Sequence, residues 1–340
     1  MNALNKMLCS MLIIFMISST AVSVTGIHTI GPTIIVDIST TSTTVLEIDF
    51  PFRGNVVQGE ITLSLAPYNG AKKEGSKSTP LFGYSSESYY SAIVNDPAQN
   101  EMYEKLLGFF DSYAQEHALT TDEYVELLTT YVQNIPYKTV GANVNFPIET
   151  VIENTGDCDD KSVLLAGLLA KRGYAAGLVC FSEENHMTAA IKELGNNMIS
   201  DYLVIETTRY AYIGENSALI RNRSRSRTRI REDSVFLVGE GTTAYTVSWQ
   251  IDTVLEKREE IIITIDSLSQ ELRSLQNEMT DQKILLGQAY DQEIYEKYES
   301  NITSYDEYMT TCYAYIDQLH TINTGSSNRE ETYQMINSMM

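Results

Sequence analysis

Between about residues 27 and 90, the apolar residues are mostly β-branched and partly alternate with polar ones. This alternation is typical of strands that bury one face. Turn-forming residues, among them Pro51, Gly54 and Gly59, separate the apolar runs. The pattern therefore predicts a small β-sandwich-like module over residues 25–91. Its predicted strands are Thr33–Ile38, Thr44–Phe50 and Glu60–Leu65.

From Asp96 onward the apolar residues take helical spacing, and a second set of strand-like runs follows them. The helix that opens near Thr120 has Glu123 at the spacing of a capping box. Helices followed by antiparallel strands are an α+β signature, which we predict over residues 92–248. The predicted elements are helices near residues 100–110, 120–135 and 158–172, then strands Gly177–Phe181, His186–Ile191, Tyr202–Glu206 and Ser234–Val238.

Beyond Trp249, apolar residues recur at alternating intervals of four and three, which is the spacing of coiled-coil seams. Gly287 and a shift of phase divide the region into two seams. We predict an antiparallel helical hairpin over residues 249–323, with a continuous rod containing a stutter as the alternative. Residues 324–340 are predicted to be a frayed tail. The seam residues are Ile261, Ile265, Leu268, Leu272, Leu275 and Met279, then Tyr298, Ile302, Tyr305, Met309, Cys312, Ile316 and Leu319.

The first 24 residues have the pattern of a targeting segment. Lys6 precedes the apolar run Met7–Ile17, and the small residues Ala21–Ser23 follow at a spacing suited to cleavage. A retained membrane anchor is the alternative. Either interpretation predicts that the rest of the chain is extracytoplasmic, secreted or held at the cell surface.

Cysteines are few in this chain, and Cys9 falls in the targeting segment. Cys158, Cys180 and Cys312 then remain, so at least one thiol is free even where disulfides form. A Cys180–Cys312 bridge is one possibility, and two buried apolar thiols are the other.

The net charge of −21 and a pI near 4.5 argue against nucleic acid as a partner. The segment Arg221–Arg231 is the exception, because its six arginines alternate with small polar residues. It is either a solvated loop or edge strand, or a docking segment for an anionic surface or acidic partner. Self-association through the C-terminal helices is a further expectation.

Three residues carry the candidate chemistry. Cys158 lies where an acidic loop turns into an apolar helix, so the helix dipole favours its thiolate. His186 begins one predicted strand, and Glu206 ends the next. A nucleophile, a base and a carboxylate that orients the base are what thiol acyl transfer requires. The neighbouring Asp157, Asp159 and Asp160 are predicted to cap the helix rather than ligate a metal, and no cofactor is called for.

The segment from about residue 100 to 210 resembles the transglutaminase-like domain of the papain superfamily, in its exported archaeal or bacterial form. The likeness rests on Tyr131–Tyr137, Gly156–Ser162, His186–Ala190 and Ile205–Thr208. It implies a papain-like core with Cys158 as nucleophile, His186 as base and Glu206 as the third member. The family usually has aspartate at that third position, and Asp201 is the nearest substitute. Tyr137 or an asparagine of the following loop is expected to help bind the oxyanion.

These features together predict an exported cysteine-dependent acyl-transfer enzyme acting on protein or peptide carboxamides, either a peptidase or amidase or a transglutaminase. Hydrolysis and crosslinking share one acyl-enzyme, so the sequence does not separate them. The alternative is a catalytically inert binding or scaffold protein with the same fold at the cell surface.

Overall fold

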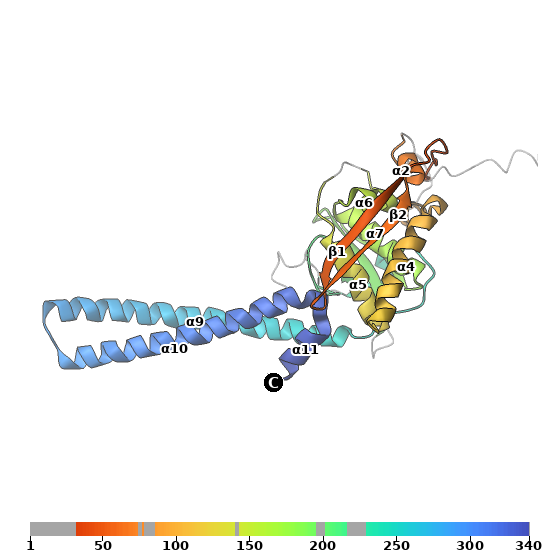
Figure 1. Cartoon of the computed structure of the whole chain (residues 1–340). Helices are drawn as coiled ribbons and strands as arrows, with labels where there is room; N and C mark the ends of the chain where they lie inside the picture. The colour runs from red at the N-terminus through yellow and green to blue at the C-terminus, as the bar shows by residue number, and fades with distance from the viewer. Residues whose placement is uncertain are drawn as a thin grey trace, which may run out of the picture.

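The computed structural model describes residues 32–73, 77, 86–139, 143–194, 201–215 and 229–339. It consists of a mixed α+β body from which a long helical hairpin projects (Figure 1). The predicted targeting segment, residues 1–24, lies outside the described residues, as does the arginine segment up to Thr228. Among the helices of the described part, none combines the length and the hydropathy needed to cross a bilayer.

The N-terminal region forms one antiparallel hairpin, β1 (Thr43–Phe52) and β2 (Asn55–Ser64), followed by the short helix α2 (Leu65–Ala71). Among the described residues, its apolar face does not meet a second sheet. Phe50 instead contacts Phe110 and Tyr131, with ring centroids 6.3 and 5.8 Å apart. The predicted β-sandwich-like module is therefore wrong, because helices from later in the chain cover this face and join it to the main core.

The predicted strand Thr33–Ile38 is also absent. The backbone N–H of Ile34 donates to the Asp96 carboxylate at 2.8 Å instead of to a neighbouring strand. Asp37 accepts from the hydroxyl of Ser39 at 2.6 Å and so closes a turn. Side-chain carboxylates thus accept hydrogen bonds here in place of the strand-to-strand hydrogen bonds that the β-branched residues had indicated.

Among the described residues, six further helical segments lie between α2 and the main sheet, and the last of them is central to the body. The predicted capping box of α5 is confirmed, since Thr120 and Glu123 each accept the other's backbone N–H. In α7 every residue from Asp160 to Leu169 is buried. The segments are α3 (Ser86–Asn95), η1 (Pro97–Gln99), α4 (Asn100–Glu116), α5 (Thr121–Asn134), α6 (Pro147–Glu153) and α7 (Cys158–Lys171).

The main sheet has five antiparallel strands in the order β6-β5-β4-β3-β7, and α7 packs against β3 and β4. The expected α+β class is thereby confirmed. The strand predicted at Ser234–Val238 shrinks to two residues, because Ser234 ends the short helix η2 (Glu232–Ser234). The strands are β3 (Ala176–Phe181), β4 (His186–Lys192), β5 (Asp201–Ile205), β6 (Arg229–Arg231) and β7 (Phe236–Leu237).

The C-terminal helices α9 (Ser248–Gln288) and α10 (Gln292–Thr324) run antiparallel and form the projecting arm (Figure 1). The predicted hairpin is confirmed, and the continuous rod is excluded by the turn between them. Most seam residues are half-buried, as expected when only two helices share a seam. Asn301 lies inside this seam and donates to Gln282 at 3.2 Å. Self-association through the arm stays a prediction.

The last residues are not a frayed tail. After η3 (Gly325–Asn328), the helix α11 (Arg329–Asn337) packs on α9, and Ile336 is fully buried. The buried Arg329 guanidinium donates from Nε to Glu126 of α5 at 2.5 Å. Tyr245 donates to the same carboxylate oxygen at 2.6 Å. The last described segment is therefore held against α9 and α5 by the buried side chain of Ile336 together with charges and hydrogen bonds.

Candidate active site

The helix α7 begins at Cys158, as predicted. Asp157 is its N-cap, with extended backbone, and its side chain accepts from the backbone N–H of Asp160. The Asp160 carboxylate in turn accepts from the Asp157 N–H at 3.3 Å. This capping box fixes the first turn of the helix and so the direction in which the Cys158 side chain leaves it.

Pairing between β4 and β5 brings His186 and Glu206 together. Ala189 stands opposite Ile205 in the register. Side chains alternate along each strand, so His186 and Glu206 project from the same face as diagonal neighbours. The Nε2–H of His186 donates to Glu206 Oε2 at 2.9 Å. The expected pairing of these two residues is confirmed. Glu206 lies one position beyond the end of β5, and its side chain is long enough to reach the His186 imidazole.

Glu206 is fully buried, and its second oxygen is held as well. Oε1 accepts from the backbone N–H of Thr208 at 2.8 Å and from the Thr208 hydroxyl at 2.6 Å. Charge-assisted bonds of this kind stabilise a buried carboxylate and fix its orientation. The carboxylate is therefore a fixed acceptor for the imidazole.

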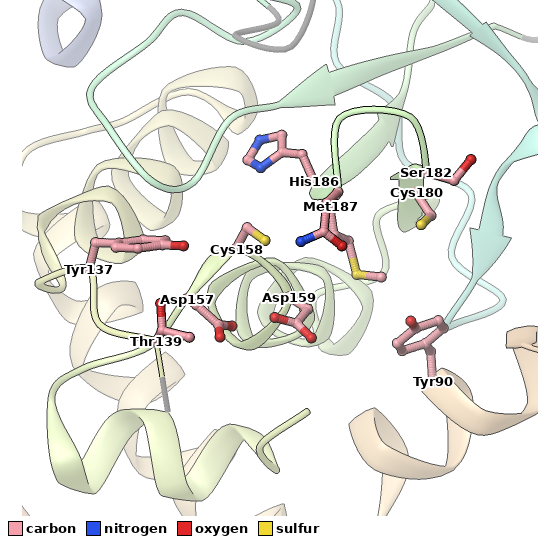
Figure 2. Close-up of a pocket in the computed structure, with 11 residues that line it drawn as sticks. Tyr90, Tyr137, Thr139, Asp157, Cys158, Asp159, Cys180, Ser182, His186 and Met187 are labelled. Carbon is pink, nitrogen blue, oxygen red and sulfur yellow. The ribbon is translucent and has the colours of Figure 1, made fainter. Parts of the chain in front are cut away.

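His186 also lines the same pocket as Cys158, and its imidazole lies beside the Cys158 side chain (Figure 2). The Cys158 side chain is the largest cause that raises the pKa of His186 to about 9, and the hydrogen bond to Glu206 is the second. Burial opposes both. Because Nε2 is engaged by Glu206, Nδ1 is the ring nitrogen left for the sulfur. The imidazolium of His186 is thus the favoured form at neutral pH.

Cys158 and His186 line a pocket of about 530 Å³ (Figure 2). Met187 and Cys180 lie on one side of the nucleophile with Tyr90, and Tyr137 lies on the other. Tyr90 stacks on Phe236 with ring centroids 5.8 Å apart, so its ring is a fixed wall. The pocket is lined by Tyr90, Tyr137, Thr139, Asp157, Cys158, Asp159, Cys180, Ser182, Asn185, His186 and Met187.

Of the two expected sources of an additional oxyanion donor, Tyr137 reaches the pocket. In Figure 2 its hydroxyl points toward Cys158. Its backbone is bridged to Gly156, close to the start of α7. Asn145 of the following loop serves a different purpose, because its backbone and side-chain amides both donate to Asp160, at 2.7 and 3.1 Å.

The three aspartates at the start of α7 bring their carboxylate oxygens within 4.8 Å of one another. Burial is the largest cause that raises the pKa of Asp159 to about 7, and a hydrogen bond to Asp157 adds to it. Burial likewise raises the pKa of Asp160 to about 6. The predicted capping role is confirmed for Asp157. Partial protonation relieves the negative charge that these residues would otherwise place beside the thiol.

Two residues near the triad were missed as functional candidates. Lys161 is fully buried, and its ammonium donates to the carbonyl oxygens of Ile135 at 2.6 Å and Gln133 at 3.3 Å. The Gln133 side chain donates to the backbone carbonyl of Glu206 at 2.8 Å. A signal was available for Lys161, because a residue three positions after Cys158 lies on the same side of the helix as the nucleophile.

Cys158, Cys180 and Cys312 are all free thiols, so the Cys180–Cys312 bridge is excluded. Cys180 is exposed on β3, whereas Cys312 is buried in the arm. Burial, reinforced by the charges of Cys158 and Asp159, raises the pKa of the Cys180 thiol. Cys180 thus shares the pocket of Cys158 but lacks a comparable activating environment, which makes it a natural internal control.

No protein-family model, no curated protein and no solved structure matches this chain. Its function must therefore be inferred from the geometry and chemistry of its own residues.

Proposed function

We propose that this protein is a transglutaminase-like, cysteine-dependent acyl-transfer enzyme. The observation that carries the proposal is that Cys158 and His186 line one pocket, while the buried Glu206 carboxylate holds the His186 imidazole at 2.9 Å. Cys158 starts the helix α7, His186 is the first residue of β4, and Glu206 follows the neighbouring strand β5. A papain-like arrangement requires nucleophile, base and carboxylate in this order. The pocket beside the thiol gives a substrate access to it.

In the proposed reaction the Cys158 sulfur attacks the carbonyl carbon of a protein or peptide carboxamide. A carbon–sulfur bond forms, and the carbonyl electrons move onto oxygen. We assign the backbone N–H groups at the start of α7 and the Tyr137 hydroxyl, which reaches the same pocket, as donors to that oxygen. The carbon–nitrogen bond then breaks, and the leaving amine takes its proton from the His186 imidazolium.

A second nucleophile then attacks the resulting thioester and takes the acyl group from Cys158. Water gives hydrolysis, and an amine gives a new amide, with His186 accepting the proton in either case. Glu206 keeps the imidazole oriented through both steps and stabilises its charged form. The open pocket admits either acceptor, so the proposal covers a peptidase or amidase as well as a transglutaminase.

The activated thiol is tested by labelling the native protein with iodoacetamide and following each cysteine by mass spectrometry. Cys158 is expected to react at least about tenfold faster than Cys180, although Cys180 is the more exposed thiol. His186→Ala should remove this advantage. The matched control is His320→Ala, which replaces an exposed histidine of the arm and should leave both rates unchanged.

Equal labelling of Cys158 and Cys180 in the folded wild type would sink the enzyme proposal. The runner-up function, an inert binding or scaffold protein at the cell surface, would then be favoured. The proposed extracytoplasmic location has a separate test. Fractionation of cells expressing the full chain should place it in the medium or the membrane fraction, and recovery in the cytosol would contradict export.

A further inference from the structure

Lys161 occupies an unusual position beneath the proposed triad. It lies one turn after Cys158 in α7, and its side chain is fully inaccessible to solvent. Its ammonium donates to the carbonyl oxygens of Gln133 and Ile135 at the C-terminal end of α5. The last carbonyls of a helix lack partners within the helix and carry partial negative charge, so they are suited to receive a cation.

The same end of α5 holds the backbone that carries Glu206. The Gln133 side chain donates to the carbonyl of Glu206 at 2.8 Å and to that of Ala211 at 3.0 Å. Lys161, Gln133 and Glu206 thus form a continuous path from the nucleophile helix, through α5, to the loop after β5. A shift of the ammonium would be transmitted to the backbone of Glu206 by two consecutive hydrogen bonds.

Charge connects Lys161 and Glu206 more directly. Burial lowers the pKa of the Lys161 ammonium to about 8, while the Glu206 carboxylate acts in the opposite direction and raises it. By reciprocity, the ammonium favours the ionised form of the carboxylate. A fully buried carboxylate needs such compensation, because removing charge from water without a partner is costly. His186, another cationic group at Glu206, changes its protonation during the proposed reaction, whereas Lys161 does not take part in proton transfer.

We propose that Lys161 is a positioning residue of the triad, which holds Glu206 in place through Gln133 and keeps it ionised by supplying a buried countercharge. The inference rests on the proposed function. It assigns to Lys161 a role that a simple cap of α5 would not have, namely control of the charge on Glu206 and thereby of the His186 orientation.

A double-mutant cycle between Lys161 and Glu206 tests this role, with the rate of Cys158 labelling by iodoacetamide as the readout. Lys161→Gln keeps a donor for the α5 carbonyls but removes the charge, and Lys161→Met removes both. Either variant is expected to slow labelling about tenfold or more in the wild-type background, and less than about threefold when Glu206→Gln is already present. Lys161→Arg should restore most of the rate.

The pH dependence separates positioning from a purely structural role. In Lys161→Gln the acid-side midpoint of the labelling curve should move to higher pH by about half a unit or more, because Glu206 has lost a neighbouring cation. Lys171→Met, an exposed lysine at the end of the same helix, is the control and should leave the midpoint in place.

Additive effects in the cycle, with an unmoved midpoint, would overturn the inference while leaving the enzyme proposal intact. Unfolding of both Lys161→Gln and Lys161→Met in either background, seen by circular dichroism, would assign Lys161 to the fold alone and overturn it equally. Failure of the proposed function can be told apart from failure of the Lys161 inference, because wild-type Cys158 itself would then show no enhanced labelling.

Discussion

The body and the projecting arm bury their residues in very different ways. In α7 every side chain from Asp160 to Leu169 is buried, whereas within α9, all of which is described, only Ile261 and Gln282 are buried beyond Leu255. The body therefore offers the low-dielectric, close-packed surroundings that shift pKa values and fix side chains. The arm presents one half-buried seam and a long solvated surface. The proposed catalytic site therefore lies in the body, where side chains are buried and fixed. The solvated surface of the arm lacks such surroundings.

The largest expected effect comes from the contact that joins the end of the chain to the body. Arg329→Met leaves the buried Glu126 carboxylate without its cation, which should lower the free energy of unfolding by about 3–5 kcal/mol. Thermal melting followed by circular dichroism measures the loss. Arg273→Met, an exposed position on α9, is the control. The double variant Glu126→Leu, Arg329→Met should regain part of the stability, and a melting temperature unchanged in the single variant would contradict the account.

The same substitution made in both regions compares them directly. Leu168→Ala removes a fully buried side chain from α7 and should cost about 3 kcal/mol of unfolding free energy. Leu272→Ala acts on a half-buried seam position and should cost about 1 kcal/mol or less. Denaturant titration of the two variants gives both values. Equal losses of unfolding free energy in the two variants would show that the arm is as tightly packed as the body, which would contradict the difference between the two regions.

The smallest expected loss of stability within the body is a pH dependence. The folded-state pKa of His186, about 9, lies above its ordinary value of 6.5, so the stabilisation is complete below about pH 6.5 and is lost as pH rises through 9. The loss should be on the order of 1–2 kcal/mol. Because Asp159 and Lys161 also titrate in this window, the wild type is compared with His186→Gln. A difference between their stabilities that stays constant from pH 6 to 10 would contradict the raised pKa.

The triad could be predicted because its signals are local. The polar start of an apolar helix marked Cys158, and the ends of two successive strands marked His186 and Glu206. The pairing of those strands was a safe expectation for neighbours in sequence. Glu206 lies one residue beyond β5, and its side chain is long enough to reach the His186 imidazole.

What the sequence did not reveal depends on partners distant along the chain. The face of the N-terminal hairpin looked like half of a sandwich because nothing near Phe50 indicates that Phe110 and Tyr131 would cover it. The final helix looked like a tail because its anchor, Arg329, pairs with a carboxylate 203 positions earlier. Lys161 looked like part of a polar helix start, although its ammonium is received by carbonyl oxygens at the end of α5.

The central claim is that Cys158 is an acyl-accepting nucleophile activated by His186. Brief incubation of the native protein with a p-nitrophenyl ester, acid quenching and mass spectrometry of the peptides tests this claim most directly. We predict the acyl group on Cys158 in the wild type and equally in Cys180→Ser, its loss in Cys158→Ala, and a rate lowered about a hundredfold or more in His186→Ala. Acylation of Cys180 instead, or acylation of Cys158 at a rate that does not depend on His186, would contradict it.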